Sequence, residues 1–245
     1  MTKRYILLIL AITLASLQAQ DITKGSIAGV VRDASGAVVA NASVRLTSPY
    51  GERVSTTSNT GDYAFSNLPV GSGYTLTVEQ PGFATAKVAN LTVSVNQRTT
   101  ADVTVQIGST TTLVDVVSVG SEAIDFATTT MGANIDQSLY QNMPVGRTVS
   151  AILLMAPGVT DGGGTGVANP SINGASGLEN QYIINGANVT DPGYGGFGTY
   201  TLNFGSLGSG VHFDFIQEVQ VKSGGFEAQY GEALGGVVNI ITKSV

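Results

Sequence analysis

The 245-residue chain contains no cysteine and no tryptophan, and its only histidine is His212. Without cysteine there can be no disulfide framework, no thiol nucleophile and no thiolate metal site. A single histidine also excludes the clustered His and Glu ligands of a zinc peptidase. We therefore expect this chain not to be an enzyme, and we expect no catalytic residue, cofactor or metal ion.

Charge is scarce as well. Charged residues make up 11% of the chain, with 11 Lys and Arg against 17 Asp and Glu and a formal net charge of −6. Nucleic-acid binding needs a basic face that neutralises phosphates, and attachment to a membrane surface needs a cluster of basic residues. The acidic balance argues against both kinds of partner.

Long hydrophobic runs are also missing, with one short run at the N-terminus. Lys3 and Arg4 precede an uncharged, mostly apolar stretch at residues 5–17, and small residues follow up to Ala19. This order is typical of a secretory signal peptide, and the run is too short for a membrane helix of about 20 residues. We expect residues 1–19 to be a signal peptide and the mature protein to be exported. The alternative is a core helix of a cytoplasmic domain.

Residues 24–108 alternate between apolar and polar side chains with period two. The alternation is clear around Ile27–Val31, Ala42–Leu46, Tyr74–Val78, Leu91–Val95 and Val103–Ile107. Turn signals rich in glycine, proline and asparagine separate these segments, and no helical period is present. Short strands at this spacing predict an all-β sandwich.

The same segment resembles the carboxypeptidase-regulatory-like domain. The matching residues are Gly25-x-Ile27-x-Gly29-x-Val31-x-Asp33, Ser35-Gly36-Ala37, Asn41-Ala42-x-Val44-x-Leu46, Gly61-x-Tyr63-x-Phe65-x-x-Leu68-Pro69-x-Gly71 and Gly82-Phe83. The resemblance implies a transthyretin-like, carbohydrate-binding-like β-sandwich that serves as an accessory module. Tyr63, Phe65 and Leu68 sit at alternating positions, which favours a role as core anchors over the alternative of a sugar-stacking platform.

Residues 109–245 have a different character. Small polar residues at 109–112 indicate a linker, which we extend to residue 120 because an extended, β-branched run occupies Leu113–Val119. The i, i+3, i+4, i+7 spacing of apolar residues predicts a helix over Thr148–Ala156, and Ile135–Pro144 is expected to form one or two helical turns capped by Asp136 or Ser138.

The remainder of this second segment is rich in glycine, with 20 glycines between Gly158 and Gly236. Asn185-Gly186 is a hairpin signal, and Ile216–Val221 and Val237–Ile241 alternate like strands. Together with the expected helices, this pattern predicts a small α+β domain over residues 121–245 with long glycine-rich loops.

This segment resembles the plug domain of a TonB-dependent outer-membrane receptor. The matching residues, in the order of the family, are Leu139-x-x-x-Met143-Pro144, Pro157-Gly158-Val159, Ser171-Ile172-Asn173-Gly174, Tyr182-Ile183-Ile184-Asn185-Gly186, the run Phe215–Val221, and Tyr230-Gly231-x-x-x-Gly235-Gly236-Val237-Val238-Asn239-Ile240-Ile241-Thr242-Lys243. With a regulatory-like domain in front, the arrangement is similar to the Oar-like and SusC-like transporters.

The resemblance implies a location on the periplasmic side of the cell outer membrane of a Gram-negative bacterium, where the plug gates uptake of a nutrient such as a saccharide or a peptide. It implies two partners, an energy-transducing TonB-type protein and a barrel of about 22 strands. The residues that resemble a TonB box are Val114, Asp115, Val116 and Val117. The alternative for Leu113–Val119 is a strand that merely links the domains.

The family's barrel would begin where this chain ends, at Val245. We therefore expect a fragment, a truncated reading frame or one part of a split system. The alternative function is a secreted or surface binding or adhesion protein that uses the carbohydrate-binding-like sandwich. An exported hydrolase built around His212 is a third hypothesis.

Gly193-x-Gly195-x-x-Gly198 matches the dinucleotide-binding fingerprint by its letters alone. That motif must follow a strand and open a helix. Here it follows Asp191-Pro192 and no helical pattern comes after it, so we interpret it as a loop.

Overall fold

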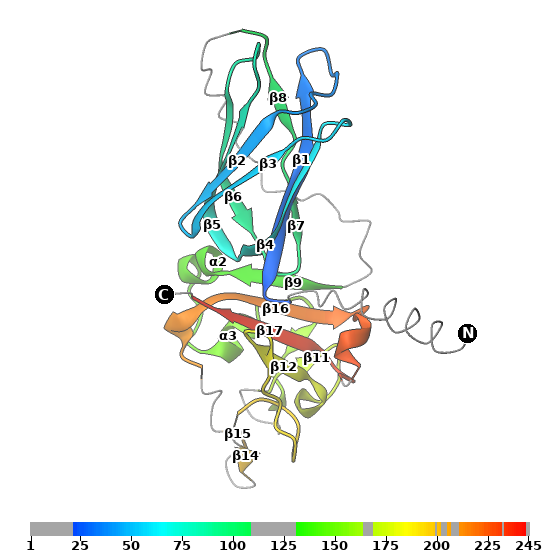
Figure 1. The fold of residues 1–245 in the computed structure, drawn as a ribbon. Coiled ribbons are helices and arrows are strands. Elements are labelled where there is room, and N and C mark those ends of the chain that lie inside the picture. The colour runs from blue at the N-terminus through cyan, green and yellow to red at the C-terminus, as the bar shows by residue number, and fades with distance from the viewer. Residues whose placement is uncertain are drawn as a thin grey trace, which may run out of the picture.

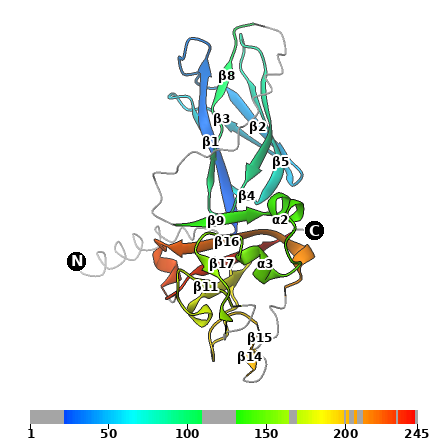
Figure 2. The same cartoon turned by 180° about the vertical axis from the view of Figure 1, so that it is seen from behind.

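The computed structural model describes residues 22–108, 131–163, 169–198, 200–201, 205–206, 211–231 and 233–243. These residues form two domains stacked end to end, seen from opposite sides in Figures 1 and 2. The predicted signal peptide at residues 1–19 and the predicted linker at residues 109–120, including Val114 to Val117, lie outside the described residues.

The N-terminal domain is a sandwich of two sheets, as predicted. In one sheet β1 (Lys24–Asp33) lies antiparallel to β4 (Asp62–Pro69) and parallel to β7 (Arg98–Thr100) and β8 (Val103–Val105). The other sheet is antiparallel throughout and has the order β3 (Gly51–Thr56), β2 (Ser43–Ser48), β5 (Gly71–Glu79), β6 (Ala86–Val93).

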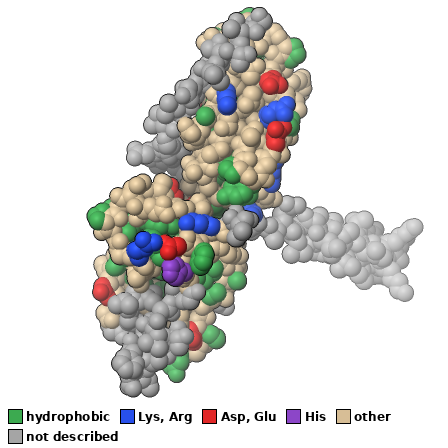
Figure 3. Space-filling view, turned by 90° about the vertical axis from the view of Figure 1, so that its left-hand side faces the viewer, with side chains coloured by type: hydrophobic (Ala, Val, Ile, Leu, Met, Phe, Trp, Pro, Cys, Tyr) green, Lys and Arg blue, Asp and Glu red, His purple; other side chains and the backbone are tan. Residues whose placement is uncertain are grey.

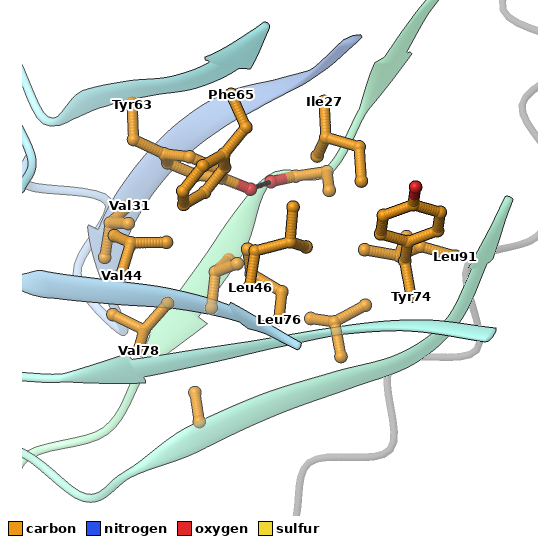
Figure 4. Close-up of a cluster of buried hydrophobic side chains, with 14 of the residues drawn as sticks. Ile27, Val31, Val44, Leu46, Tyr63, Phe65, Tyr74, Leu76, Val78 and Leu91 are labelled. Carbon is orange, nitrogen blue, oxygen red and sulfur yellow. Dashed lines mark hydrogen bonds between the residues drawn. The ribbon is translucent and has the colours of Figure 1, made fainter. Parts of the chain in front are cut away.

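The core of the sandwich lies between these two sheets (Figure 4). Tyr63, Phe65 and Leu68 are buried there, and the ring centroids of Tyr63 and Phe65 are 6.0 Å apart in an edge-to-face arrangement. The Tyr63 hydroxyl donates a hydrogen bond to the Ala101 carbonyl, so its polar end is satisfied inside the core. The prediction that these residues are core anchors is confirmed.

Two glycines of β1, Gly25 and Gly29, allow a close approach of another stretch of backbone. A Cβ atom on Gly29 would stand 2.0 Å from the carbonyl oxygen of Ala101, and one on Gly25 would stand 2.3 Å from that of Ser94. The chain from β6 to β8 therefore runs directly against β1, which only a residue without a side chain permits.

The C-terminal domain is built on a five-stranded sheet of order β13 (Ala187–Asn188), β12 (Gln181–Ile184), β17 (Val237–Thr242), β16 (Ile216–Gly224), β9 (Met131–Asp136). Strands β12 and β17 are parallel and the other pairs are antiparallel. Two small hairpin pairs, β10 (Val159–Thr160) with β11 (Ser171–Ile172) and β14 (Tyr200–Thr201) with β15 (Gly205–Ser206), lie outside this sheet.

Several short helices complete the part of the domain that the structure describes. They are α2 (Gln137–Asn142), α3 (Val149–Leu153), and the 3-10 helices η2 (Gly177–Glu179), η3 (Phe213–Phe215) and η4 (Ala228–Tyr230). The buried side chains of α2 and α3 pack on one face of the sheet, against Val219, Val221, Val238 and Ile240. The prediction of an α+β domain is confirmed.

The first helix has Asp136 as its N-cap, one of the two caps predicted, although the predicted range began one residue earlier, at Ile135. Ile135 belongs to β9, and α2 starts only after Asp136, whose carboxylate accepts a hydrogen bond of 2.8 Å from the Leu139 amide. A residue that caps a helix in this way has extended backbone, so the residue before it continues the strand.

The second helix is shorter than the predicted Thr148–Ala156. Thr148 is the N-cap, and after Leu153 the amides of Met155 and Ala156 bond to carbonyls three residues back, which tightens the last turn into a 3-10 form. Val149, Ile152, Leu153 and Ala156 are all buried, so the predicted apolar face is correct even though the α-helix is shorter.

Turn predictions in this domain are also confirmed. Asn185 and Gly186 both have positive φ, at 48° and 85°, and join β12 to β13 as a tight hairpin. Gly193 and Gly195 lie in a turn held by Asp191, and the next described element is the strand β14, so the loop interpretation holds for the residues that the structure describes. Within the described ranges, no helix is long and apolar enough to cross a membrane.

We expect Gly29→Ala to lower the free energy of unfolding of the sandwich by about 1–3 kcal/mol, because the new methyl group must displace the backbone at Ala101. Thermal unfolding followed by circular dichroism measures the loss. Gly224→Ala is the control, because no atom lies within 4 Å of its added Cβ. Equal melting temperatures for the two variants would contradict the close approach of the Ala101 backbone to Gly29.

Candidate functional site: a polar junction between the two domains

The second face of the C-terminal sheet is polar and buried. Along β16, Val219 and Val221 point into the domain core, while Glu218, Gln220 and Lys222 point the other way. As whole residues, these three are only 1%, 5% and 1% exposed. A strand of this pattern commonly has its polar face in water, so another part of the molecule must cover it.

Neighbouring strands extend the polar face. Gln220 is paired in register with Asn134 of β9 on one side and Asn239 of β17 on the other. The Gln220 side-chain amide donates to Asn134 Oδ1 at 3.1 Å, and Asn239 donates to the carbonyl of Ile22 at 3.0 Å. The three amides form a row across the sheet, and its far end holds the segment that precedes β1.

The covering element is the tight turn Ser94–Gln97 between β6 and β7 of the sandwich. The Val95 amide donates to Glu218 Oε1 at 3.1 Å. The Val95 carbonyl accepts from Asn134 at 3.2 Å and from Gln220 at 3.1 Å. Both backbone groups of one residue are therefore bound by side chains of the other domain.

An apolar contact reinforces this docking. The Val95 side chain is fully buried and forms a small cluster with Val70 of the sandwich and Ile241 of β17. Removal of these side chains from water favours association, and the hydrogen bonds around Val95 define its geometry. Figure 1 shows the lower ends of β1, β4 and β7 meeting the sheet at β9 and β16.

A second polar contact lies beside the first. Lys222 Nζ is 2.8 and 2.7 Å from the two carboxylate oxygens of Glu227, and Asn96 of the turn donates to Glu227 Oε1 at 3.1 Å. The ammonium group also stands 4.6 Å from the ring centroid of Tyr230. The buried cation is thus neutralised and linked to the sandwich through Glu227.

The two carboxyl groups of the junction respond to their surroundings in opposite directions. Burial raises the pKa of Glu218 to about 7, against the hydrogen bonds from Val95 and Asn134, which lower it; nearby Asp136 raises it further. Burial also acts to raise the pKa of Glu227, but the hydrogen bond and charge of Lys222 prevail and lower it below its ordinary value.

The sequence predicts β16 as a strand but does not show that its polar face is buried. The available signal was the run Glu218-x-Gln220-x-Lys222 on a strand whose other face is apolar. Such a pattern cannot distinguish water from a second domain as the neighbour of its polar face. The polar face becomes a junction only because the Ser94–Gln97 turn, more than a hundred residues earlier, lies against it.

The predicted TonB-box-like residues, Val114 to Val117, lie outside the described residues. The first described element after them in the chain is β9, the edge strand of the sheet. His212 is exposed, with 69% of its side chain accessible, and lies beside Asp214, which pairs with Arg147 at 2.5 Å (Figure 3). In the part of the chain that the structure describes, no three His, Cys, Asp or Glu residues gather as metal ligands would.

A shallow pocket of about 70 Å³ opens on the sandwich near the junction, lined in part by Tyr50, Glu52, Arg53 and Tyr74. Tyr50 is 45% exposed, whereas the Tyr74 ring is buried and its hydroxyl donates to the Pro69 carbonyl at 2.6 Å. Arg53 donates to the carbonyls of Ser66 and Asn67. These side chains therefore tie the two sheets together at the rim.

Two protein-family models match the chain, one in each domain. A model described as the carboxypeptidase regulatory-like domain matches residues 26–106, and one described as the TonB-dependent receptor plug domain matches residues 122–237. The TonB-dependent transporter Oar of Myxococcus xanthus is 29% identical over 231 residues, which cover 89% of this chain and 20% of that protein. The chain thus spans about a fifth of the length of this relative.

Solved structures resemble about a third of the chain. A candidate carbohydrate-binding protein from Bacteroides uniformis is 20% identical over 33% of this chain and 40% of that one, with a TM-score of 0.29. The TIE protein of Bacillus anthracis is 19% identical over 35% of this chain and 17% of that one, with a TM-score of 0.31. Similarity of this extent does not bear on ligands.

We predict that removing either partner of the Lys222–Glu227 ion pair lowers stability by a different amount. The Lys222 side chain is 2% exposed and that of Glu227 is 39% exposed. Glu227→Ala leaves the ammonium buried without a partner, so we expect it to lower the free energy of unfolding by about 2–4 kcal/mol. Lys222→Met leaves a carboxylate that water can reach, and we expect a loss of about 1 kcal/mol.

Urea unfolding of the two variants measures the difference. Glu52→Ala, which breaks the exposed pair with Arg45, is the control and should change stability by less than about 0.5 kcal/mol. A larger loss in Lys222→Met than in Glu227→Ala would show that the pair does not bury its cation in solution.

Proposed function

Because the chain joins a carboxypeptidase regulatory-like domain at residues 26–106 to a TonB-dependent receptor plug domain at residues 122–237, we propose that it is the N-terminal part of a TonB-dependent outer-membrane transporter. The observation that carries this proposal is the order of the two domains, which a single alignment to the transporter Oar spans over 89% of the chain. We place the protein on the periplasmic side of the outer membrane.

The shape of the plug domain suits a gate. Its hydrogen-bonded sheet and apolar core form a base, and β14 and β15 of the glycine-rich segment lie at the end away from the sandwich (Figures 1 and 2). We propose that this loop end, within residues 158–212, faces the nutrient in the lumen of a barrel of about 22 strands. The sandwich end then faces the periplasm. A saccharide or a peptide is the cargo we propose, on the family resemblance.

We further propose that Val114, Asp115, Val116 and Val117 bind an energy-transducing TonB-type protein. Their β-branched sequence favours an extended conformation, and they precede β9, the edge strand of the plug sheet, in the chain. An extended segment can be engaged by strand addition, in which main-chain hydrogen bonds supply affinity. A pull on this segment would be transmitted to β9 first and then to its neighbour β16.

The transporter assignment predicts a large native polypeptide. An antibody raised against residues 109–245 should detect, in isolated outer membranes, a band several-fold larger than the 25.1 kDa of this chain. The band should shift on heating, as folded barrels do. A band at the chain's own mass in the soluble fraction would contradict the assignment and favour the alternative of a secreted binding or adhesion protein.

The proposed partner site predicts a loss of binding when strand pairing is blocked. Proline lacks the amide hydrogen that a paired strand donates, so Val116→Pro should weaken binding to the purified C-terminal domain of a TonB-type protein at least about tenfold. Isothermal titration calorimetry with the full chain measures this. Thr111→Pro, in the small polar run ahead of the segment, is the control, and equal affinity for both variants would exclude the site.

A further inference from the structure

Glu218 is a buried carboxyl group at the contact between the two domains. Its Oε1 atom accepts a hydrogen bond from the Val95 amide of the sandwich at 3.1 Å and another from Asn134 of the plug at 2.7 Å. One oxygen atom thus receives a donor from each domain. A protonated carboxyl group keeps both bonds, because its carbonyl oxygen can accept them while Oε2 carries the proton.

The charges around Glu218 do not favour its ionised form. On its own strand, Lys222 is held by both oxygens of Glu227 in the segment that follows β16. Asp136 of β9, paired in register with Glu218, adds a like charge. The covering turn Ser94–Gln97 and the apolar Val70 and Ile241 bring no charged side chain, and Lys24 at the start of β1 contributes a backbone carbonyl to the turn. Among the described residues Glu218 has no ion-pair partner.

We propose that Glu218 is a proton-controlled latch between the sandwich and the plug. The sandwich docks with the Glu218 carboxyl group protonated, and separation of the domains exposes the side chain to water and releases the proton. The inference rests on the junction alone and holds whether or not the chain belongs to a transporter.

The direction of the pH dependence follows from the burial of this group. Burial raises the pKa of Glu218 to about 7, against an ordinary value of 4.5 when water surrounds it. Between these values the docked state holds a proton that the separated state has lost. Docking is therefore strongest at low pH, weakens as pH rises towards about 7, and becomes constant above it. One unit of pKa difference corresponds to a tenfold change in the docking equilibrium.

The test uses residues 20–245, the chain without its predicted signal peptide, and the amide resonance of Val95 as a local probe of the Glu218 contact. In wild type we expect this resonance to titrate with a midpoint near pH 7. The chain has no cysteine, so labels at Val54→Cys on the sandwich and Leu154→Cys on the plug, both exposed positions, report domain separation by energy transfer. The fraction separated should rise at least about tenfold between pH 5 and pH 8.

Two variants separate the latch from a purely structural role. Glu218→Gln keeps the acceptor for Val95 and Asn134 but cannot ionise, so docking should stay at its low-pH level throughout and the titration should disappear. Asp136→Asn, which can still cap α2, removes the like charge and should move the midpoint to lower pH. Glu52→Gln on the exposed edge strand β3 is the control. In this variant the Val95 resonance should show the same pH dependence as in wild type.

A Val95 resonance that does not titrate, or a midpoint near the ordinary value of 4.5, would overturn the proposal. So would pH-dependent separation that persists unchanged in Glu218→Gln. If Glu218→Gln fails to fold, the shift of the midpoint in Asp136→Asn decides the question, and an unchanged midpoint there would also count against the latch. Failure of the latch leaves the membrane and TonB-binding experiments unaffected.

Discussion

The backbone amide and carbonyl of Val95 are both bound by side chains of the opposite domain, and the arrangement of the whole molecule depends on this contact. A buried peptide group without partners costs about 1–3 kcal/mol for each unmet hydrogen bond. The Ser94–Gln97 turn therefore lies stably on the plug only where Glu218, Asn134 and Gln220 meet it together. A shift of the sandwich by one residue along β16, about 3.3 Å, would move the backbone groups of Val95 out of hydrogen-bond reach of these side chains.

This junction differs in kind from the cores on either side of it. Each core is held by many apolar contacts, whereas the junction combines one small apolar cluster with a row of hydrogen bonds. Polar interfaces of this type are typical of domains that move relative to each other. A gate that is pulled from its periplasmic side would gain from such a contact, because the contact orients the sandwich without fusing the two cores.

Within the plug, the separation of the sheet from the loops is consistent with the proposed gating function. β16 and β17 are covered on both faces, by the helices on one side and by the sandwich and the Ile22 segment on the other. The glycine-rich loops project from the far end of this base. Force applied near β9 would reach β16 first, and β16 carries the residues that hold the sandwich. The proposed TonB contact and the domain junction thus act on neighbouring strands of one sheet.

Much of the fold follows from local pattern in the sequence. The alternation around Ile27, Leu46 and Tyr74 specified strands with one buried face, Asn185-Gly186 specified a hairpin, and the spacing of Val149, Ile152 and Leu153 specified a helix face. These features depend on residues close together in the chain, so local chemistry determines them. The ends of the helices were predicted less accurately, because a capping side chain such as that of Asp136 and a final 3-10 turn determine where each helix begins and ends.

The candidate site could not be predicted in the same way. The sequence by itself determined that Glu218, Gln220 and Lys222 share one face of a strand, and that β1 has no side chain at Gly25 and Gly29. Only the tertiary structure decided that the Ser94–Gln97 turn covers that face, because the contact joins residues more than a hundred positions apart and is specified by backbone groups that every residue type carries. The tertiary structure also decides the pKa of Glu218. Burial at the junction raises this pKa, and the neighbours of Glu218 in the sequence do not.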